Sequence, residues 1–444
     1  MSIRINLLED DIQKTLVKMT TPMMLGIVSL MLFNLADLYF VSRLGTDALA
    51  ALGFTFPVCF MVISLAIGLG IGTSAILARL LGRGESDEAQ SLATDNLLAI
   101  AVMIVVISGL LQLLIDPVFY AMGARDALMP FIQAYMRVWL IGSVFLVINM
   151  VSNACMRATG DTKTPALMMA GSSLLNFILD PLFIFGVGPI EGMGIQGAAI
   201  ASVIAWSLTT CVALYLLFVH KRLLVLQPFV FSRWKRHAYA VMKIALPASL
   251  SNMMTPVAQA VLTYIVAHHG PEAVAAFGVG NRIESLALLV CLALSMTLPP
   301  FISQNIGAGH VERVRSAYRM VIGFSLFWQF LVFILLIFVA EDVATLFSGN
   351  NTVQSLIVLW IFIVPFGFAF QAITFLTASS FNALHKPFMA MKISLARLFL
   401  FTVPFAWLGS QLFGLQGMFI ALVVSNLCVA VLAWLSMSAH LRAS

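Results

Sequence analysis

Six ionisable side chains lie within long apolar stretches of the sequence, and they are the first candidates for chemistry. Placing a charge at the centre of a lipid bilayer costs about 2.5–3.5 kcal/mol on insertion scales, so such residues are rare where they serve no function. We expect the two aspartates to carry the chemistry, because a buried carboxylate can bind a proton or a cation. The set comprises Asp37, Arg137, Asp180, Arg282, Glu284 and Arg397.

Both aspartates follow an amide side chain on the same side of a predicted helix. Asn34 precedes Asp37 by three residues and Asn176 precedes Asp180 by four, spacings that bring side chains together on an α-helix. Asp37 is fifteen residues beyond Pro22, about 22 Å along a helix, and Asp180 is sixteen residues beyond Thr164, about 24 Å. The two helices run in the same direction, so we expect the acids at similar depth. Withdrawal from water favours the neutral carboxyl group, which allows reversible protonation. The same oxygens, with the amides, offer Na⁺ an alternative site.

A wider polar network is predicted around these acids. Asn149 and Asn153 are spaced by four residues on one helix, and Asn149 comes level with Asn176 when counted from the turn at Gly160. Methionine suits a permissive binding site because its side chain is flexible and polarisable. We assign substrate-binding or polar-network roles to Asn149, Asn153, Ser202, Tyr39, Met31 and Met150.

Pro22 is a candidate hinge in the first apolar stretch, because proline frees a backbone carbonyl and bends a helix. A static kink is the alternative. Arg282 and Glu284 are two residues apart and do not face each other on a helix, so they pair with other helices or mark a break. Arg137 and Arg397 are expected to extend toward the headgroups or to pair structurally.

The composition places most of the chain in lipid. Of its 444 residues, 61% are hydrophobic and 10% charged, with a mean hydropathy of +1.02, whereas a soluble domain carries about 25% charged residues. Twelve stretches are long enough to span a bilayer. They are expected near 17–42, 50–78, 92–115, 129–156, 164–187, 195–219, 240–267, 274–302, 316–339, 353–380, 388–412 and 417–438.

The distribution of cations orients these helices. Of the 24 lysines and arginines, 19 fall in segments on one side, and only Arg43 and Arg125 fall in loops on the other. The positive-inside rule therefore places both termini in the cytoplasm. The net charge of +5 is spread over short loops rather than one basic stripe, which disfavours nucleic acid as a partner. The five scattered cysteines form no CxxC motif, so neither a metal site nor a disulfide framework is expected.

The two halves of the sequence repeat one another. A shift of 225 residues aligns Pro22 with Pro247, and a shift of 220 aligns the pair Gly194 and Gly197 with its counterpart in the second half. We predict an all-α integral membrane protein with twelve transmembrane helices in two parallel six-helix repeats around a central cavity. The predicted parts are an N-lobe (1–219), a basic cytoplasmic linker (220–239) and a C-lobe (240–444).

The two halves of the repeat differ in their intramembrane acids. Asp37 corresponds to Leu262 and Asp180 to Thr402, so the second half keeps the helices without the acids. Carboxylates that were needed only to build the helices would be expected in both halves. The asymmetry therefore favours a functional role for the acids of the first half.

The sequence resembles the multidrug and toxic compound extrusion (MATE) family, and within it the DinF-like branch of bacteria and archaea. The similar features are the stretch from Pro22 to Asp37, the segment Gly45–Gly53, the run from Arg157 to Pro165, and Asn176 with Asp180 before Pro181. The second half echoes them from Phe381 to Pro387.

This resemblance implies a monomeric antiporter in the cytoplasmic (inner) membrane that exports amphipathic, often cationic drugs against an inward H⁺ or Na⁺ gradient. No cofactor beyond the coupling ion is implied. Some branches place acidic cation ligands in the second half, where this chain has Gln259, Gln371 and Thr374. That departure favours protons passing through the first half.

Two other functions fit the sequence less well. A lipid-linked oligosaccharide flippase would need cationic residues along its cavity and commonly has additional spans, whereas this polar cluster is acidic. An intramembrane enzyme is disfavoured because the sequence contains no HExxH, no GxSxG and no paired-aspartate motif.

Overall fold

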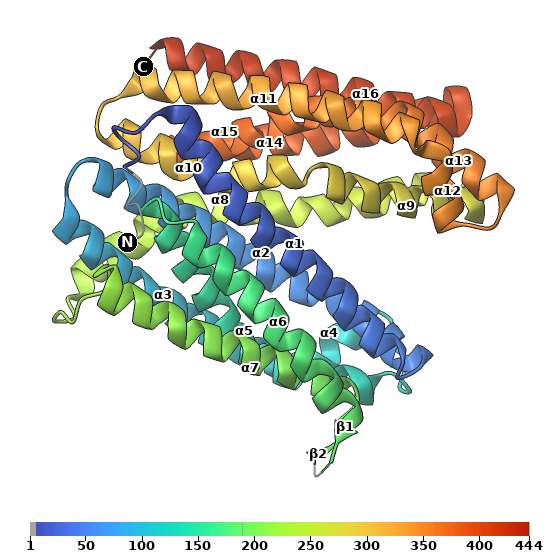
Figure 1. Cartoon of the computed structure of the whole chain (residues 1–444). Coiled ribbons are helices and arrows are strands. Elements are labelled where there is room, and N and C mark those ends of the chain that lie inside the picture. Colours follow the sequence, from blue (N-terminus) through green and yellow to red (C-terminus); the bar gives the residue numbers. More distant parts are fainter. Residues whose placement is uncertain (1–5, 189, 444) are drawn as a thin grey trace. The chain divides into compact units, whose positions relative to one another are not determined.

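The structure is a computed structural model that describes residues 6–188 and 190–443, and it is almost entirely α-helical (Figure 1). Among the described residues, eleven helices are long and apolar enough to cross a membrane, judged by length and composition. The longest, Pro387–Arg442, contains non-helical backbone at Phe413 and Gly414, so it supplies two of the predicted spans. The predicted twelve-helix fold is confirmed.

In the part of the first half that the structure describes, the chain forms seven helices and one small hairpin. A glycine-containing hairpin of two short antiparallel strands, β1 (Gly186–Val187) and β2 (Ile190–Glu191), joins the last two helices. The short helix α4 was not predicted, because seven residues are too few to stand out as a span. The helices are α1 (Ile12–Ser42), α2 (Thr46–Gly82), α3 (Ser86–Leu113), α4 (Ile115–Ala121), α5 (Met129–Ala158), α6 (Lys163–Phe185) and α7 (Ile195–Tyr215), which ends in the π-helical turn Leu216–His220.

The second half contains more interruptions than the sequence predicted. The expected helix 274–302 breaks at Leu288, where neither glycine nor proline gives a signal, and the expected helix 353–380 is interrupted by a 3₁₀ turn at Val364–Gly367. The π-helical segment Ala396–Thr402 precedes α16. The helices are α8 (Phe231–Ala267), α9 (Pro271–Ala287), α10 (Leu289–Gly307), α11 (Val311–Phe338), α12 (Ala340–Phe347), α13 (Asn351–Ile363), α14 (Phe368–Ala383), α15 (Pro387–Leu395) and α16 (Val403–Ala443).

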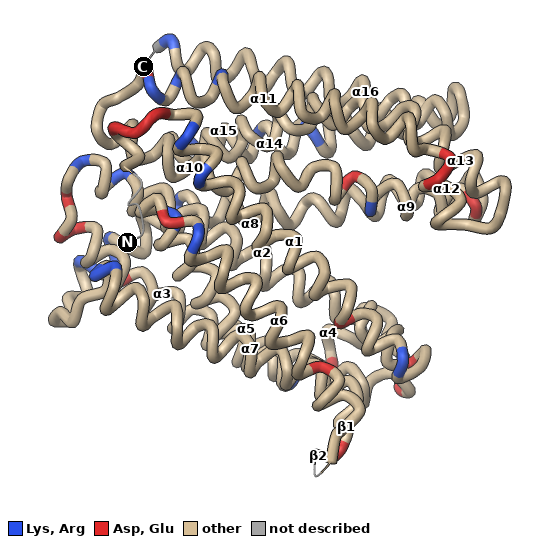
Figure 2. The backbone as a smooth tube through the Cα atoms, viewed as in Figure 1, with Lys and Arg blue, Asp and Glu red and all other residues tan. Residues whose placement is uncertain are grey.

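Charged side chains gather near the ends of the helices, as expected for a protein in lipid. Figure 2 shows the middle stretches of most helices without Lys, Arg, Asp or Glu. Many large apolar side chains on these stretches are exposed, among them Leu25, Val105 and Phe327. In a bilayer these surfaces face acyl chains and not water.

The chain divides into two compact units, and the division differs from the predicted lobes. The first unit is built mainly from Thr21–Ser249, and the second from Leu7–Thr20 and Leu250–Ser444. The boundary therefore lies within α8, ten residues beyond the end of the predicted linker 220–239. Residues 221–230 are irregular, and helix begins at Phe231.

Glycines in α2 explain why the first turns of α8 belong to the first unit. A Cβ atom on Gly68 would lie 2.5 Å from the Ala245 carbonyl oxygen, and one on Gly72 would lie 2.8 Å from that of Val241. Only glycine allows two helix backbones to approach so closely. The packing holds α8 against α2 as far as Ser249, whose hydroxyl group contacts the Leu65 carbonyl oxygen at 3.5 Å.

The N-terminal segment belongs to the second unit for a similar local reason. The Asn305 amide donates to the Leu7 carbonyl oxygen at 3.0 Å, and the Arg313 guanidinium donates to that of Asp10 at 2.7 Å. The hydroxyl groups of Thr20 and Thr297 lie 3.0 Å apart. Helix α1 therefore passes from one unit to the other next to Pro22.

The backbone confirms the internal repeat at its glycines. Gly194 has φ 57° and ψ −135°, and Gly414 has φ 62° and ψ −151°, a conformation that disfavours other residues. Three residues after each of these glycines, a second glycine packs closely against the preceding helix. A Cβ atom on Gly197 would lie 2.8 Å from the Ile184 nitrogen, and one on Gly417 would lie 2.5 Å from the Cβ of Phe413.

Candidate functional site

Asp180, Asn176 and Ser202 form a buried polar group between α6 and α7. All three side chains are nearly inaccessible, with at most 5% exposed. With its nitrogen facing the carboxylate, the Asn176 amide donates to Asp180 Oδ1 at 2.7 Å, and its oxygen accepts from the Ser202 hydroxyl group at 3.0 Å. The helical spacing of four residues brings amide and acid together, as predicted. Ser202 therefore orients the amide that holds the carboxylate.

Asp37 lies in α1 and contributes the second carboxylate of the site. Its side chain is half-buried, and its Oδ1 atom is buried without a hydrogen-bond partner among the described residues. A buried polar atom that lacks a partner is uncommon and points to a bound ion, proton or water. Asp37 lies within range of a charge–charge interaction with Asp180, so α1 and α6 place the two acids in the same region of the first unit.

Close packing of α1 on α6 sets this arrangement. A Cβ atom on Gly26 would lie 3.1 Å from the Ala166 Cα and 3.3 Å from the Met169 sulfur. Nearer the acids, the rings of Phe40 and Phe177 stand 5.7 Å apart between centroids. The small residue lets the helices approach, and the aromatic contact fixes their rotation.

Tyr135 of α5 is a further member that the sequence did not reveal. It is 7% exposed and lies close enough to Asp37 and Asp180 for their charges to act on its hydroxyl group. Tyr135 does not stand out among the ionisable side chains of the predicted spans, because a phenol is neutral. A useful signal would have been that a tyrosine inside a predicted span needs a polar partner for its hydroxyl group.

Asn149 and Asn153 form a second polar pair on α5. The Asn153 amide donates to Asn149 Oδ1 at 2.8 Å. The Asn149 nitrogen and the Asn153 oxygen are buried, and neither has a hydrogen-bond partner among the described residues. The predicted pairing within α5 is therefore present, while no described hydrogen bond joins this pair to Asp180.

The other predicted site residues are exposed or only partly buried. Asn34 and Tyr39 are exposed on α1, with 58% of Tyr39 accessible. Met31 and Met150 are partly buried. Pro22 stands inside α1, and the helix continues through it without a break.

The second unit buries a different ionic group. The Gln371 amide donates to Glu284 at 2.7 Å, and Glu284 interacts electrostatically with Arg397. The Arg397 guanidinium lies 4.7 Å from the centroid of the Phe375 ring, and its side chain is 8% exposed. Glu284 thus contacts another helix, α14. Among the described residues, no group of three or more His, Cys, Asp or Glu side chains is arranged to hold a metal ion.

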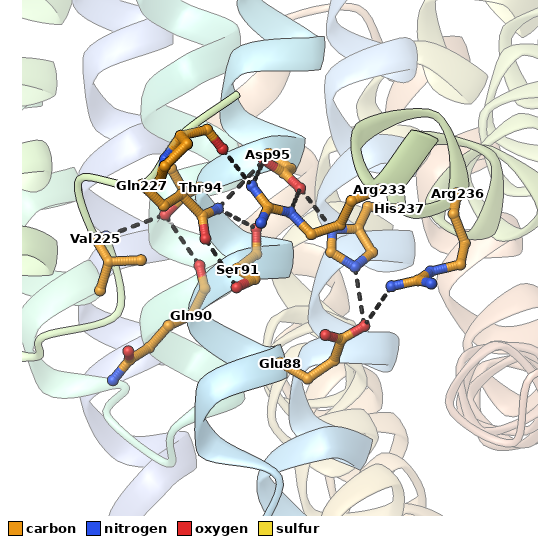
Figure 3. A network of polar contacts seen from close by, with 11 residues as sticks. Glu88, Gln90, Ser91, Thr94, Asp95, Val225, Gln227, Arg233, Arg236 and His237 are labelled. Carbon is orange, nitrogen blue, oxygen red and sulfur yellow. Dashed lines mark hydrogen bonds and ion pairs between the residues drawn. The ribbon is translucent and has the colours of Figure 1, made fainter. Parts of the chain in front are cut away.

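A charged network ties the start of α8 to α3 (Figure 3). Asp95 accepts from Arg233 Nε at 2.9 Å, and His237 Nδ1 lies 2.9 Å from the same carboxylate. The other ring nitrogen of His237 lies 3.1 Å from Glu88, and Gln227 donates to Asp95 at 3.3 Å. The Asp95 and His237 side chains are 4% and 3% exposed. The sequence predicted only a basic loop here.

The turn between α5 and α6 contains an ion pair outside the spans. Lys221 Nζ lies 2.6 Å from Asp161, and the Thr164 hydroxyl group donates to the same carboxylate at 2.6 Å. Burial alone would raise the pKa of Asp161, but Lys221 and the two donors of Thr164 hold the pKa of this carboxyl below its usual value.

Comparison with known proteins places this fold and site in context. The MatE family model matches residues 22–182 and 247–408. A protein of Shewanella oneidensis named FAD transporter is 40% identical over 97% of this chain and 95% of its own length. A probable multidrug resistance protein NorM of Thermotoga maritima is 26% identical over 77% and 73%.

Solved structures agree over almost the whole chain. The Vibrio cholerae MATE transporter VcmN in the bent form is 33% identical, covers 97% of both chains and has a TM-score of 0.92. An outward-facing multidrug resistance MATE family transporter of the MOP superfamily is 28% identical, covers 100% and 99%, and has a TM-score of 0.93. The two matched segments of the family model correspond to the two repeats seen in the backbone.

Proposed function

Because this chain belongs to the MATE family of membrane transporters, we propose that it exports an amphipathic solute in exchange for protons moving inward. As a transporter and not an enzyme, it moves its solute without chemical change. We place it in the bacterial inner membrane as a monomer, with both termini in the cytoplasm as the cation distribution indicates.

One observation carries the choice of coupling ion. Asp180 is held by Asn176, while Asp37 beside it has a buried oxygen without a described hydrogen-bond partner. Two nearby carboxylates in a poorly hydrated site cannot both keep their charge cheaply, so one of them binds a proton readily. Proton binding removes the repulsion between α1 and α6, and proton loss restores it.

Helix α1 links this site to a larger movement. It carries Asp37 in the first unit, and its first turns belong to the second unit. Pro22 stands at the passage between the two, where its missing N–H weakens the helical ladder. We propose that a change of charge at Asp37 alters the packing of α1 on α6 and bends the helix at Pro22, so that the units move as two lobes.

The relatives suggest two substrate classes. The protein named FAD transporter is 40% identical, whereas the relatives named for multidrug resistance or export are 21–26% identical. The higher identity favours flavin adenine dinucleotide, an amphipathic solute with flat aromatic ring systems and a charged pyrophosphate. Amphipathic cationic drugs are the second class, favoured by an acidic site.

Transport into everted membrane vesicles tests both the ion and the substrate. We expect uptake of flavin adenine dinucleotide that depends on a pH gradient and falls at least tenfold in Asp37→Asn. The matched control is Asp47→Asn, an exposed acid in the first turn of α2, which should transport as the parent does. Uptake that requires Na⁺ and ignores the pH gradient would overturn proton coupling. Uptake of cationic dyes alone would assign the drug class instead.

A further inference from the structure

A pocket lined by three arginines lies at one end of the second unit. Its cavity volume is ≈ 390 Å³, and its walls come from the first turns of α11 and the last turns of α16. Figure 1 shows these helix ends side by side, and Figure 2 shows Lys and Arg gathered there. The arginines are Arg315, Arg319 and Arg442, and all the lining residues are described ones that include no Asp or Glu.

The wall of the pocket is rigid and partly aromatic. The ring of Tyr318 stacks on that of Trp434 with centroids 6.0 Å apart and an interplanar angle of 24°. The Tyr318 hydroxyl group lies 2.7 Å from the Thr377 hydroxyl group of α14, and this hydrogen bond holds the ring in place. Arg315 donates to the Leu441 carbonyl oxygen at 2.6 Å and so ties α11 to α16. The pocket is therefore built before any ligand arrives.

Two of the arginines are available for a ligand. Arg315 also pairs with Glu312 at 2.5 Å, so its charge is partly neutralised. Arg319 and Arg442 are exposed and line the pocket from opposite helices. Two guanidinium groups that face one cavity suit a phosphate, whose oxygens accept paired hydrogen bonds from arginine.

The first unit shows what covers the same place in the other repeat. At the 225-residue shift, Arg315 and Arg319 correspond to Gln90 and Thr94 of α3. The Thr94 hydroxyl oxygen accepts from the Val225 backbone N–H at 3.1 Å, so the chain after α7 lies over α3 (Figure 3). There the chain after α7 covers Thr94, a neutral side chain. In the second unit the corresponding residue is Arg319, which lines the pocket.

Apolar surface continues from the pocket along both helices. Leu435 lines the pocket and is 61% exposed, and Val431 stands one turn further along α16. On α11, Phe327 lies two turns beyond Arg319 and is 67% exposed. An anion bound at the arginines would therefore continue into an apolar surface, which fits a lipid and not a soluble anion.

We propose that this pocket binds the phosphate headgroup of an anionic phospholipid, with the acyl chains along α11 and α16. Arg319 and Arg442 contact the phosphate oxygens, and Trp434 borders the glycerol region, where indole rings are favoured. The lipid takes the place that the chain after α7 takes in the first unit.

Native mass spectrometry of the purified full chain tests the site directly. With phosphatidylglycerol as the probe, we expect one saturable lipid per chain and at least tenfold weaker binding of phosphatidylcholine. The double variant Arg319→Gln/Arg442→Gln should bind phosphatidylglycerol about 30-fold more weakly, which corresponds to about 2 kcal/mol at about 1 kcal/mol per cation. The control Lys235→Gln/Lys392→Gln removes the same charge from exposed positions outside the pocket and should bind as the parent does.

A second variant keeps all three arginines in place. Ser438→Glu adds a negative charge to the pocket wall and should weaken phosphatidylglycerol binding while leaving phosphatidylcholine binding unchanged. Equal binding of phosphatidylglycerol by the parent and both pocket variants would overturn the site. Full displacement of the lipid by millimolar inorganic phosphate would also overturn it, because the pocket would then select a soluble anion.

Discussion

Removing the charge of Asp95 should destabilise the protein through the network at the start of α8. Asp95→Asn keeps the shape of the side chain but replaces a carboxylate that accepts from Arg233 at 2.9 Å and approaches His237 at 2.9 Å. The Asp95 side chain is 4% exposed, so water cannot replace these partners without a rearrangement. Figure 3 shows that every contact of this carboxylate joins α3 to the segment after α7 or to α8.

The magnitude follows from burial and hydrogen bonding. Removing one partner of a buried ion pair costs about 3–5 kcal/mol, and hydrogen bonds to charged groups contribute about 1.5–3 kcal/mol. Arg233 keeps access to water because 22% of its side chain is exposed, and it also donates to the Pro228 carbonyl oxygen. We therefore expect Asp95→Asn to lower the free energy of unfolding by about 2–3 kcal/mol.

Thermal unfolding of the detergent-purified protein measures this effect. A loss of this size should lower the apparent Tm by about 5–10 °C at 2–4 °C per kcal/mol. The matched control is Glu85→Gln at the same end of α3, where the carboxylate lies 3.8 Å from Arg83 and is 47% exposed. That surface pair should change the apparent Tm by about 2 °C or less. Equal Tm values for the two variants would refute the account of the network.

Three further predictions test the site, the fold and the ion pair at the turn. Asn176→Leu removes the amide that donates to Asp180, so solute transport should fall at least tenfold. The apparent Tm should shift by only a few degrees. Unchanged transport would contradict the site. Gly417→Ala should destabilise by about 1–3 kcal/mol because its Cβ would collide with the preceding helix, whereas Gly171→Ala, with open space around it, should be neutral or stabilising. Asp161→Asn should lower stability at pH 7, because Lys221 holds the pKa of the Asp161 carboxyl group below its usual value. The ionised carboxylate therefore stabilises the folded protein at pH values above the unfolded-state pKa near 3.8. This stabilisation is lost as the pH falls through the pKa of Asp161 in the folded protein. Thermal scans from pH 7 to pH 3 should show the difference shrinking, and a constant difference would contradict the assignment.

The long apolar stretches and the repeated spacing of glycines predicted the fold well, because lipid restricts the backbone to a few structures. Apolar stretches of sufficient length must become helices, and the repeated pair Gly194 and Gly197 marks the same turn that Gly414 makes in the second half. The break at Leu288 was not predicted, because apolar residues continue through it without proline or glycine. The sequence predicts that the first turns of α8 belong to the linker and the second half, because their basic residues suggest a loop. The close packing of Gly68 against α8 places these turns in the first unit, and composition gives no sign of that packing.

The candidate site was predictable where chemistry and helical spacing coincide. Asn176 and Asp180 are four residues apart, and the structure brings them together with Ser202 as expected. Tyr135 was missed because its relation to the acids depends on how α5 packs, which no local pattern encodes. The buried pair of Arg233 and Asp95 was missed for the same reason, since 138 residues separate its partners.

Proton release on solute binding tests the central claim most directly. The purified protein, in weakly buffered detergent solution with a pH-sensitive dye, is mixed with flavin adenine dinucleotide at pH 7. We predict that the parent and Asp47→Asn release protons as the solute binds, and that Asp37→Asn and Asp180→Asn bind it with little or no release. Proton release by both site variants equal to that of the parent would contradict coupling through these two carboxylates.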